Sequence, residues 1–137
     1  GWPPDIIHCH GWFSSLVPLY IKKIFKDNPL FSDSKVVFSV YDNGFEEKLS
    51  GDFAKKLKFD KIKDEDLKHF KNAGFQSLNK AAIDHSDAVV YGSENIDPEL
   101  DKYARGKDLP LLEYKDRETY IDAYNAFYDD LLKDLEE

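Results

Sequence analysis

Short apolar runs alternate along this chain with longer segments that have the apolar spacing of an amphipathic helix. The runs cover residues 5–10, 35–41 and 88–91, and a fourth candidate covers residues 110–114. Strands that alternate with helices form parallel sheets, because a parallel connection needs a crossover of a dozen or more residues. The pattern therefore predicts an α/β fold that contains a parallel sheet.

The segments between the runs predict helices with one apolar face. We expect helices over about residues 11–25, 46–57, 64–86, 98–105 and 117–135. The last is amphipathic, and its stripe of Tyr120, Tyr124, Phe127 and Leu131 is expected to dock on the domain. With 137 residues, 42% of them apolar, the chain is expected to form a single α/β domain over residues 1–137, with helices on both faces of the sheet.

The charge balance excludes several classes of partner. Nineteen basic residues stand against 27 acidic ones, which leaves a net charge of −8 that repels nucleic acid and anionic membranes. No apolar stretch is long enough to span a bilayer. A single cysteine, Cys9, fits a reducing, cytoplasmic setting, and four scattered histidines without further thiols predict neither a metal nor another cofactor.

Ligands of parallel α/β sheets gather beyond the carboxyl ends of the strands. In this chain that rule selects residues 8–12, 41–44 and 92–95, and the first of these is the most informative. Alternation along a strand sends His8 and His10 to one face and Cys9 to the other. We expect His8 to be a structural, hydrogen-bonded residue, whereas His10 fits that role and ligand binding equally well.

Three weaker patterns have ordinary structural interpretations. Glu46 and Glu47 with Asp42 could imitate a pair of glycosidase carboxylates, but a solvated helix start explains them better. Ser14 near His10 lacks the glycine-framed elbow of a nucleophilic serine. The tyrosines of the last predicted helix could stack on sugar rings, although aromatic residues at helical spacing more often belong to a core.

Three stretches resemble the glycogen and starch synthases. The run Trp-Pro-Pro-Asp-Ile-Ile-His-Cys-His-Gly-Trp at residues 2–12, followed by Leu-Val-Pro-Leu-Tyr-Ile-Lys at 16–22, is similar to that family's Pro-Asp-(apolar)₂-His-Ala-His-Asp-Trp segment and the helix after it. Residues 35–43 and 79–100 resemble two later segments. The resemblance implies half of a Rossmann-like N-terminal domain of a two-domain GT-B enzyme, which transfers glucose from ADP-glucose or UDP-glucose to an α-1,4-glucan.

Two departures from the family pattern fall at positions that the resemblance places near the transferred glucose. Gly11 stands where the family has aspartate, and Tyr41 stands where it has histidine. The family's Lys-Thr-Gly-Gly-Leu motif and its donor-binding domain would belong to upstream and downstream segments that this sequence does not include. We therefore expect no confident catalytic residue here and no glucose transfer by this chain alone.

The resemblance also assigns a candidate site. By motif position, the residues expected to line the glucan-facing cleft are His10, Trp12, Tyr41, Asp42 and Asn43, with His8 and Gly11 structural at the strand end. The expected partners are ADP-glucose or a glucan in the intact protein. The alternative is a non-catalytic homologue that binds glucan or a partner protein and regulates synthesis.

Overall fold

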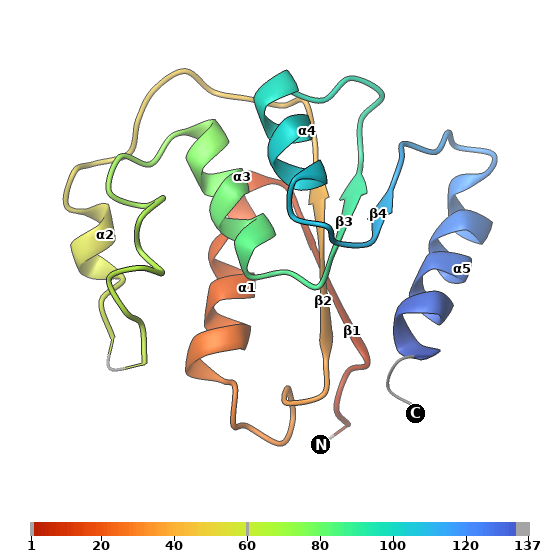
Figure 1. Cartoon of the computed structure of the whole chain (residues 1–137), viewed down its shortest axis with the longest axis horizontal. Helices are drawn as coiled ribbons and strands as arrows, with labels where there is room; N and C mark the ends of the chain where they lie inside the picture. The colour runs from red at the N-terminus through yellow and green to blue at the C-terminus, as the bar shows by residue number, and fades with distance from the viewer. Residues whose placement is uncertain (1, 60, 134–137) are drawn as a thin grey trace.

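A computed structural model describes residues 2–59 and 61–133 and contains a four-stranded parallel sheet (Figure 1). The strands lie in the order β1-β2-β3-β4, and their bounds are Ile6–His10, Lys35–Val40, Ala88–Tyr91 and Leu111–Leu112. Each neighbouring pair is parallel. The predicted α/β fold with a parallel sheet is confirmed. Within the described residues, no helix has the length and apolar character needed to cross a membrane.

The helices occupy the connections, but several differ from their predicted bounds. In chain order they are η1 (Trp12–Ser14), α1 (Leu16–Leu19), η2 (Tyr20–Ile24), α2 (Phe53–Lys56), α3 (Phe75–Asp84), α4 (Pro98–Arg105) and α5 (Tyr120–Lys133).

The first predicted helix is one helical segment of changing type, since η1 is a 3₁₀ turn and η2 is a π-helical turn. The predicted helix over 46–57 was wrong for most of its length, because only α2 forms there. The predicted helix over 64–86 was also wrong in its first half. Residues 64–72 form turns, and α3 begins after Gly74, where the Ser77 hydroxyl accepts the Gly74 N–H at 2.7 Å.

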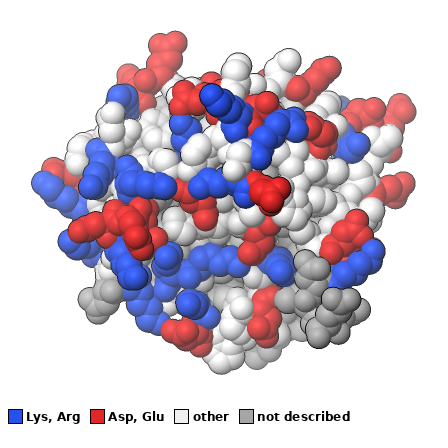
Figure 2. Space-filling model, in the orientation of Figure 1, with Lys and Arg blue, Asp and Glu red and all other residues white. Residues whose placement is uncertain are grey.

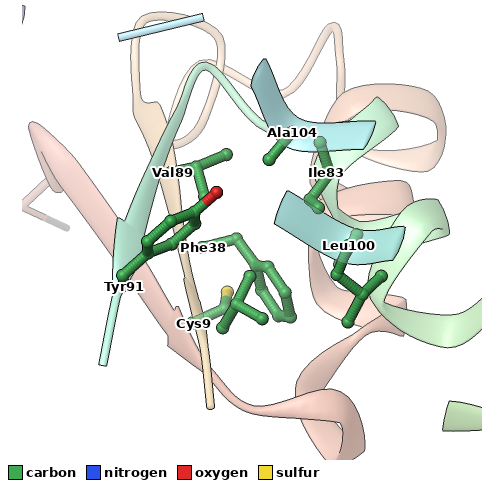
Figure 3. Close-up of a cluster of buried hydrophobic side chains, with 9 residues drawn as sticks. Cys9, Phe38, Ile83, Val89, Tyr91, Leu100 and Ala104 are labelled. Carbon is green, nitrogen blue, oxygen red and sulfur yellow. The ribbon is translucent and has the colours of Figure 1, made fainter. Parts of the chain in front are cut away.

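One face of the sheet packs against α3 and α4. Figure 3 shows the strand residues Cys9, Phe38, Val89 and Tyr91 facing Ile83 of α3 and Leu100 and Ala104 of α4. The side chains of this cluster are almost fully buried. A second apolar cluster joins α1 and α2 to α3 through Leu19, Ala54 and Leu78. This face therefore carries the main core of the domain.

The opposite face of the sheet packs against α5. Val37, Ala88 and Val90 contact Leu131, Phe127, Tyr124 and Tyr128 of the helix. Helices on both faces of the sheet and the docking of the amphipathic α5 were predicted, and both are confirmed. Two members of the stripe, Tyr124 and Phe127, are half-buried, whereas Tyr120 at the start of the helix is 41% exposed.

The first strand differs in place from what its sequence indicates. A short apolar run such as residues 5–10 is typical of a buried, interior parallel strand, but β1 lies at one edge of the sheet formed by the described residues and pairs with β2. Its side chains are half-buried at Ile6, Ile7 and His8, buried at Cys9 and exposed at His10. An apolar run preceded by two prolines indicates a strand but does not give its place in the strand order.

Candidate functional site

The candidate site lies where β1, β2 and β3 end together at the carboxyl edge of the sheet. Two backbone hydrogen bonds extend the ladder past the strands: Gly11 N–H donates to the Ser39 carbonyl at 3.0 Å, and Gly92 N–H donates to the Val40 carbonyl at 2.8 Å. Since these bonds tie the first residues after β1 and β3 to β2, they hold the three loop starts side by side.

Two stacked imidazoles form the centre of this site. The rings of His8 and His10 lie 4.1 Å apart and nearly parallel, on the α5 side of the sheet. His8 Nε2 hydrogen-bonds to Ser39 Oγ at 2.6 Å, and Nδ1 hydrogen-bonds to the Tyr128 hydroxyl of α5. Burial, with a smaller effect from His10, lowers the pKa of His8 to about 4. His8 is therefore neutral at physiological pH and connects the sheet to α5.

The second imidazole joins the ends of β1 and β2. His10 Nδ1 hydrogen-bonds to the Tyr41 hydroxyl at 2.7 Å, and His10 itself is exposed. Burial lowers the pKa of His10 and raises that of Tyr41, whose phenol therefore stays protonated. This pair presents neutral hydrogen-bonding groups at the carboxyl edge.

The ring of Tyr41 lies directly on the backbone of Gly92. A Cβ atom at position 92 would come within 2.6 Å of Tyr41 Cζ and 2.8 Å of Cδ1, well inside van der Waals contact. Glycine at the end of β3 therefore leaves the space that the phenol needs to reach His10. Gly92 is thus a packing partner of the site.

Replacing Gly92 with alanine is expected to lower the free energy of unfolding by about 1.5 kcal/mol, because the added methyl group overpacks against the Tyr41 ring. In a Tyr41→Ala background the same change is expected to lower it by less than about 0.5 kcal/mol. Urea denaturation of the four proteins of this double-mutant cycle measures the difference. Additive effects of the two substitutions would contradict the packing described here.

The other predicted site residues lie apart from the histidine pair. The Asp42 backbone N–H donates to Ser93 Oγ, and the Ser93 hydroxyl donates to Asp42 Oδ1, both at 3.1 Å, which ties the loops after β2 and β3 together. Asp42 and Asn43 are exposed in this loop. Trp12 packs at 4.5 Å against Phe45, in the cluster of α1, α2 and α3 on the opposite side of the sheet from His10.

The backbone at Gly11 explains this separation. Its φ of 78° and ψ of 166° lie in a region that is essentially restricted to glycine, and the chain turns sharply there from β1 into η1. A Cβ atom at this position would also lie 3.1 Å from Cε1 of Phe13. This local conformation sends Trp12 away from the imidazoles, although the alternation of a continued strand would have kept it on their face.

Sequence reasoning missed Ser39, Ser93 and Tyr128. Ser39 pairs with His10 in the register of β1 and β2, so strand alternation alone could have placed its hydroxyl on the histidine face. Ser93 lies in a strand-end segment that the carboxyl-end rule selected. Tyr128 was recognised as an aromatic of the last helix, but no local signal connects it with His8, which lies 120 positions earlier.

The site differs in charge from a separate, open groove in the described part of the chain. That groove lies at the opposite, amino edge of the sheet, where Lys22, Lys23, Lys26 and Lys107 alternate with aspartates. Figure 2 shows basic side chains in a band across the lower half of this view, interspersed with acidic ones. Two of the ion pairs join Lys107 Nζ to Asp84 and Lys22 Nζ to Asp87, both at 2.6 Å. The candidate site, in contrast, presents imidazoles, hydroxyls and one carboxylate.

Taken together, the order and direction of the strands and the helices on both faces of the sheet define a Rossmann-like α/β domain. Residues 1–112 match the family model of the starch synthase catalytic domain. The chain therefore belongs to the starch synthase catalytic domain family, and it is a glycogen synthase-like domain, as its resemblance to glycogen and starch synthases predicted.

Individual relatives agree with the family match. The chain is 30% identical over 116 residues to the glycogen synthase of Pelodictyon phaeoclathratiforme, which covers 80% of this chain and 23% of that protein. It is 28% identical over 111 residues to the glycogen synthase of Clostridium perfringens, covering 79% and 22%. The glycogen synthase of Chlorobium limicola is 50% identical over 42 residues, 31% of this chain and 9% of that protein. The chain thus spans less than a quarter of the length of these relatives.

Proposed function

We propose that this chain binds an α-glucan at the carboxyl edge of its sheet, as the acceptor side of a GT-B glucosyltransferase of the glycogen synthase type. The intact protein would transfer glucose from ADP-glucose, or UDP-glucose, to an α-1,4-glucan, whereas this chain alone binds glucan without transferring glucose. The family match and the glycogen synthase relatives support this assignment. The cytoplasm is the proposed location, since Cys9, the one cysteine of this sequence, is a free thiol, which fits a reducing compartment.

The observation that carries the proposal is the uncharged, hydrogen-bonding character of the His10–Tyr41 pair. A sugar hydroxyl can donate to or accept from a neutral imidazole or a phenol, so such a pair suits a neutral carbohydrate. A departing nucleoside diphosphate requires fixed positive charge or aligned N–H donors. The lysines of the amino-edge groove cannot supply this charge to a ligand bound at the candidate site, because the groove lies at the other edge of the sheet.

The second candidate function is a non-catalytic one, in which the domain binds glucan or a partner protein and regulates synthesis. Two observations favour it. The backbone conformation at Gly11 is essentially restricted to glycine, so no carboxylate can be accommodated there without a change of conformation. The Tyr41 phenol occupies the space above Gly92 that a smaller side chain would leave open to a ligand.

Replacing His10 with alanine is expected to weaken binding of maltoheptaose and glycogen about tenfold, because the exposed imidazole no longer meets sugar hydroxyls. Isothermal titration calorimetry and affinity electrophoresis in glycogen gels measure the change. Lys26→Ala, an exposed substitution in the groove at the other edge, is the control and is expected to bind like the wild type. Failure of the wild-type chain to bind either glucan would overturn the proposed function.

A transfer assay separates the two candidate functions. The chain is incubated with radiolabelled ADP-glucose or UDP-glucose and glycogen, and we expect no label in the polymer. Transfer by this chain alone would contradict our proposal that it only binds glucan. The same assay with the full-length parent protein decides between the glucosyltransferase and the regulator: label in the polymer supports the first, and its absence despite glucan binding supports the second.

A further inference from the structure

Five aromatic rings form a continuous strip from the start of α5 across the sheet to the end of β2. The ring centroids of Tyr120 and Tyr124 lie 5.7 Å apart, and those of Tyr124 and His8 lie 5.8 Å apart. His8 stacks on His10 at 4.1 Å, and His10 lies 6.1 Å from Tyr41. Each ring therefore contacts or nearly contacts the next, and the strip includes the central pair of the candidate site.

Two rings of the strip, Tyr120 and His10, are exposed to solvent, whereas His8, Tyr124 and Tyr41 are half-buried. Tyr120 is 41% exposed, as is Tyr114 in the loop after β4, and His10 is also exposed. Tyr124 is half-buried, and its pKa is raised first by burial and then by the neighbouring phenols of Tyr41 and Tyr120. Several phenols thus gather on the α5 side of the sheet with part of their surface accessible.

The chemistry of this strip matches one ligand class. A pyranose ring has apolar C–H faces and a rim of hydroxyls, and tyrosine offers a flat apolar face with a hydrogen-bonding tip. A row of rings can therefore contact successive sugars of a chain, whereas a compact ligand would use only one or two of them. Among the described residues, none of the five side chains takes part in an ion pair, and His8 and His10 hydrogen-bond to the hydroxyl groups of Tyr128, Ser39 and Tyr41.

We propose that α5 extends the candidate site into an elongated carbohydrate subsite, in which Tyr120 holds an α-glucan chain beyond the sugar that contacts His10 and Tyr41. This inference rests on the proposed glucan-binding function. It assigns a role to a helix that begins at Tyr120, outside the residues 1–112 that match the family model. The tyrosines of this helix then do more than fill the space between α5 and the sheet.

Replacing Tyr120 with alanine tests the subsite. Its exposed side chain at the first turn of α5 contributes little to the core, so the variant is expected to fold. We expect maltoheptaose to bind about tenfold more weakly, but maltose to bind with nearly unchanged affinity, since a disaccharide at His10 does not reach the helix. Tyr120→Phe, which keeps the ring, is expected to restore most of the affinity.

Ile121→Ala is the matched control, because Ile121 is the next residue of the helix and is 58% exposed but not aromatic. Calorimetry on all four proteins gives the affinities, and circular dichroism checks the helix. The subsite would be overturned if Tyr120→Ala bound maltoheptaose as tightly as the wild type does, or if it lost the same affinity for maltose as for maltoheptaose. The proposed function would stand in either case. Absence of glucan binding by the wild type would overturn both.

Discussion

Replacing Asp87 with alanine is expected to lower the free energy of unfolding by about 3 kcal/mol. Asp87 Oδ2 accepts the backbone N–H of Val36 at 2.7 Å and the ammonium group of Lys22 at 2.6 Å. Val36 is fully buried in β2, so its N–H would lose its acceptor without gaining water. The change would therefore leave an unsatisfied donor in the core and an unpaired lysine beside it. Urea denaturation monitored by tyrosine and tryptophan fluorescence measures the loss.

Two variants separate the contribution of the Val36 N–H from that of the Lys22 ammonium group. Asp87→Asn keeps an oxygen for the Val36 N–H and is expected to recover more than half of the stability. Lys22→Ala removes only a partly exposed partner and is expected to lower stability by less than about 1 kcal/mol. If Asp87→Ala proved no more harmful than Lys22→Ala, the buried N–H would have found another acceptor and this account of β2 would be wrong.

Acidification from pH 7 to pH 4 is expected to destabilise the folded chain by about 2 kcal/mol through His8 alone. The ordinary pKa of histidine is about 6.5, and burial next to His10 lowers the pKa of His8 to about 4. Between these values the unfolded chain binds a proton that the folded chain does not. Stability therefore falls as the pH drops through this window. The partial exposure of His8 reduces the effect below that of a fully desolvated group.

Comparison with His8→Gln isolates this contribution from that of the carboxylates. Asp66 and Asp84 have lowered pKa values in the folded state, so their stabilisation is lost only as the pH falls through those lower values. Glutamine does not titrate, and the variant is expected to show a shallower fall in stability between pH 6.5 and pH 4. Urea midpoints measured at half-unit intervals test this, and equal slopes for both proteins would contradict it.

The elements that sequence predicted well are those with strong local signals. β2 and β3 consist of buried, valine-rich runs, and their observed bounds agree with prediction within one residue. α4 has a cap and a proline at its start, where the Asp97 side chain accepts the N–H groups of Glu99 and Leu100. Residues 46–59 and 61–72 lack such signals, and burial of Leu57, Leu67 and Phe70 against α1 and α3 stabilises their turns. Tertiary contacts therefore decided their conformation.

The candidate site was predictable to the extent that it depends on adjacent strands. The carboxyl ends of β1 and β2 must meet in a parallel pair, so sequence alone could bring His10 and Tyr41 together. It could not bring Tyr128 to His8, because the docking of α5 depends on packing across the whole sheet face. Nor could it place Trp12, whose direction follows from one glycine dihedral angle.

The unequal covering of the two sheet faces has a consequence for how the domain fluctuates. Among the described residues, α3 and α4 hold one face together, whereas the histidine face is covered by α5. A transient detachment of that helix would hydrate the half-buried imidazole of His8 while the rest of the molecule stays folded, because local openings follow such separable units. Opening of this one helix would thus expose the buried part of the aromatic strip, without any rearrangement of the sheet.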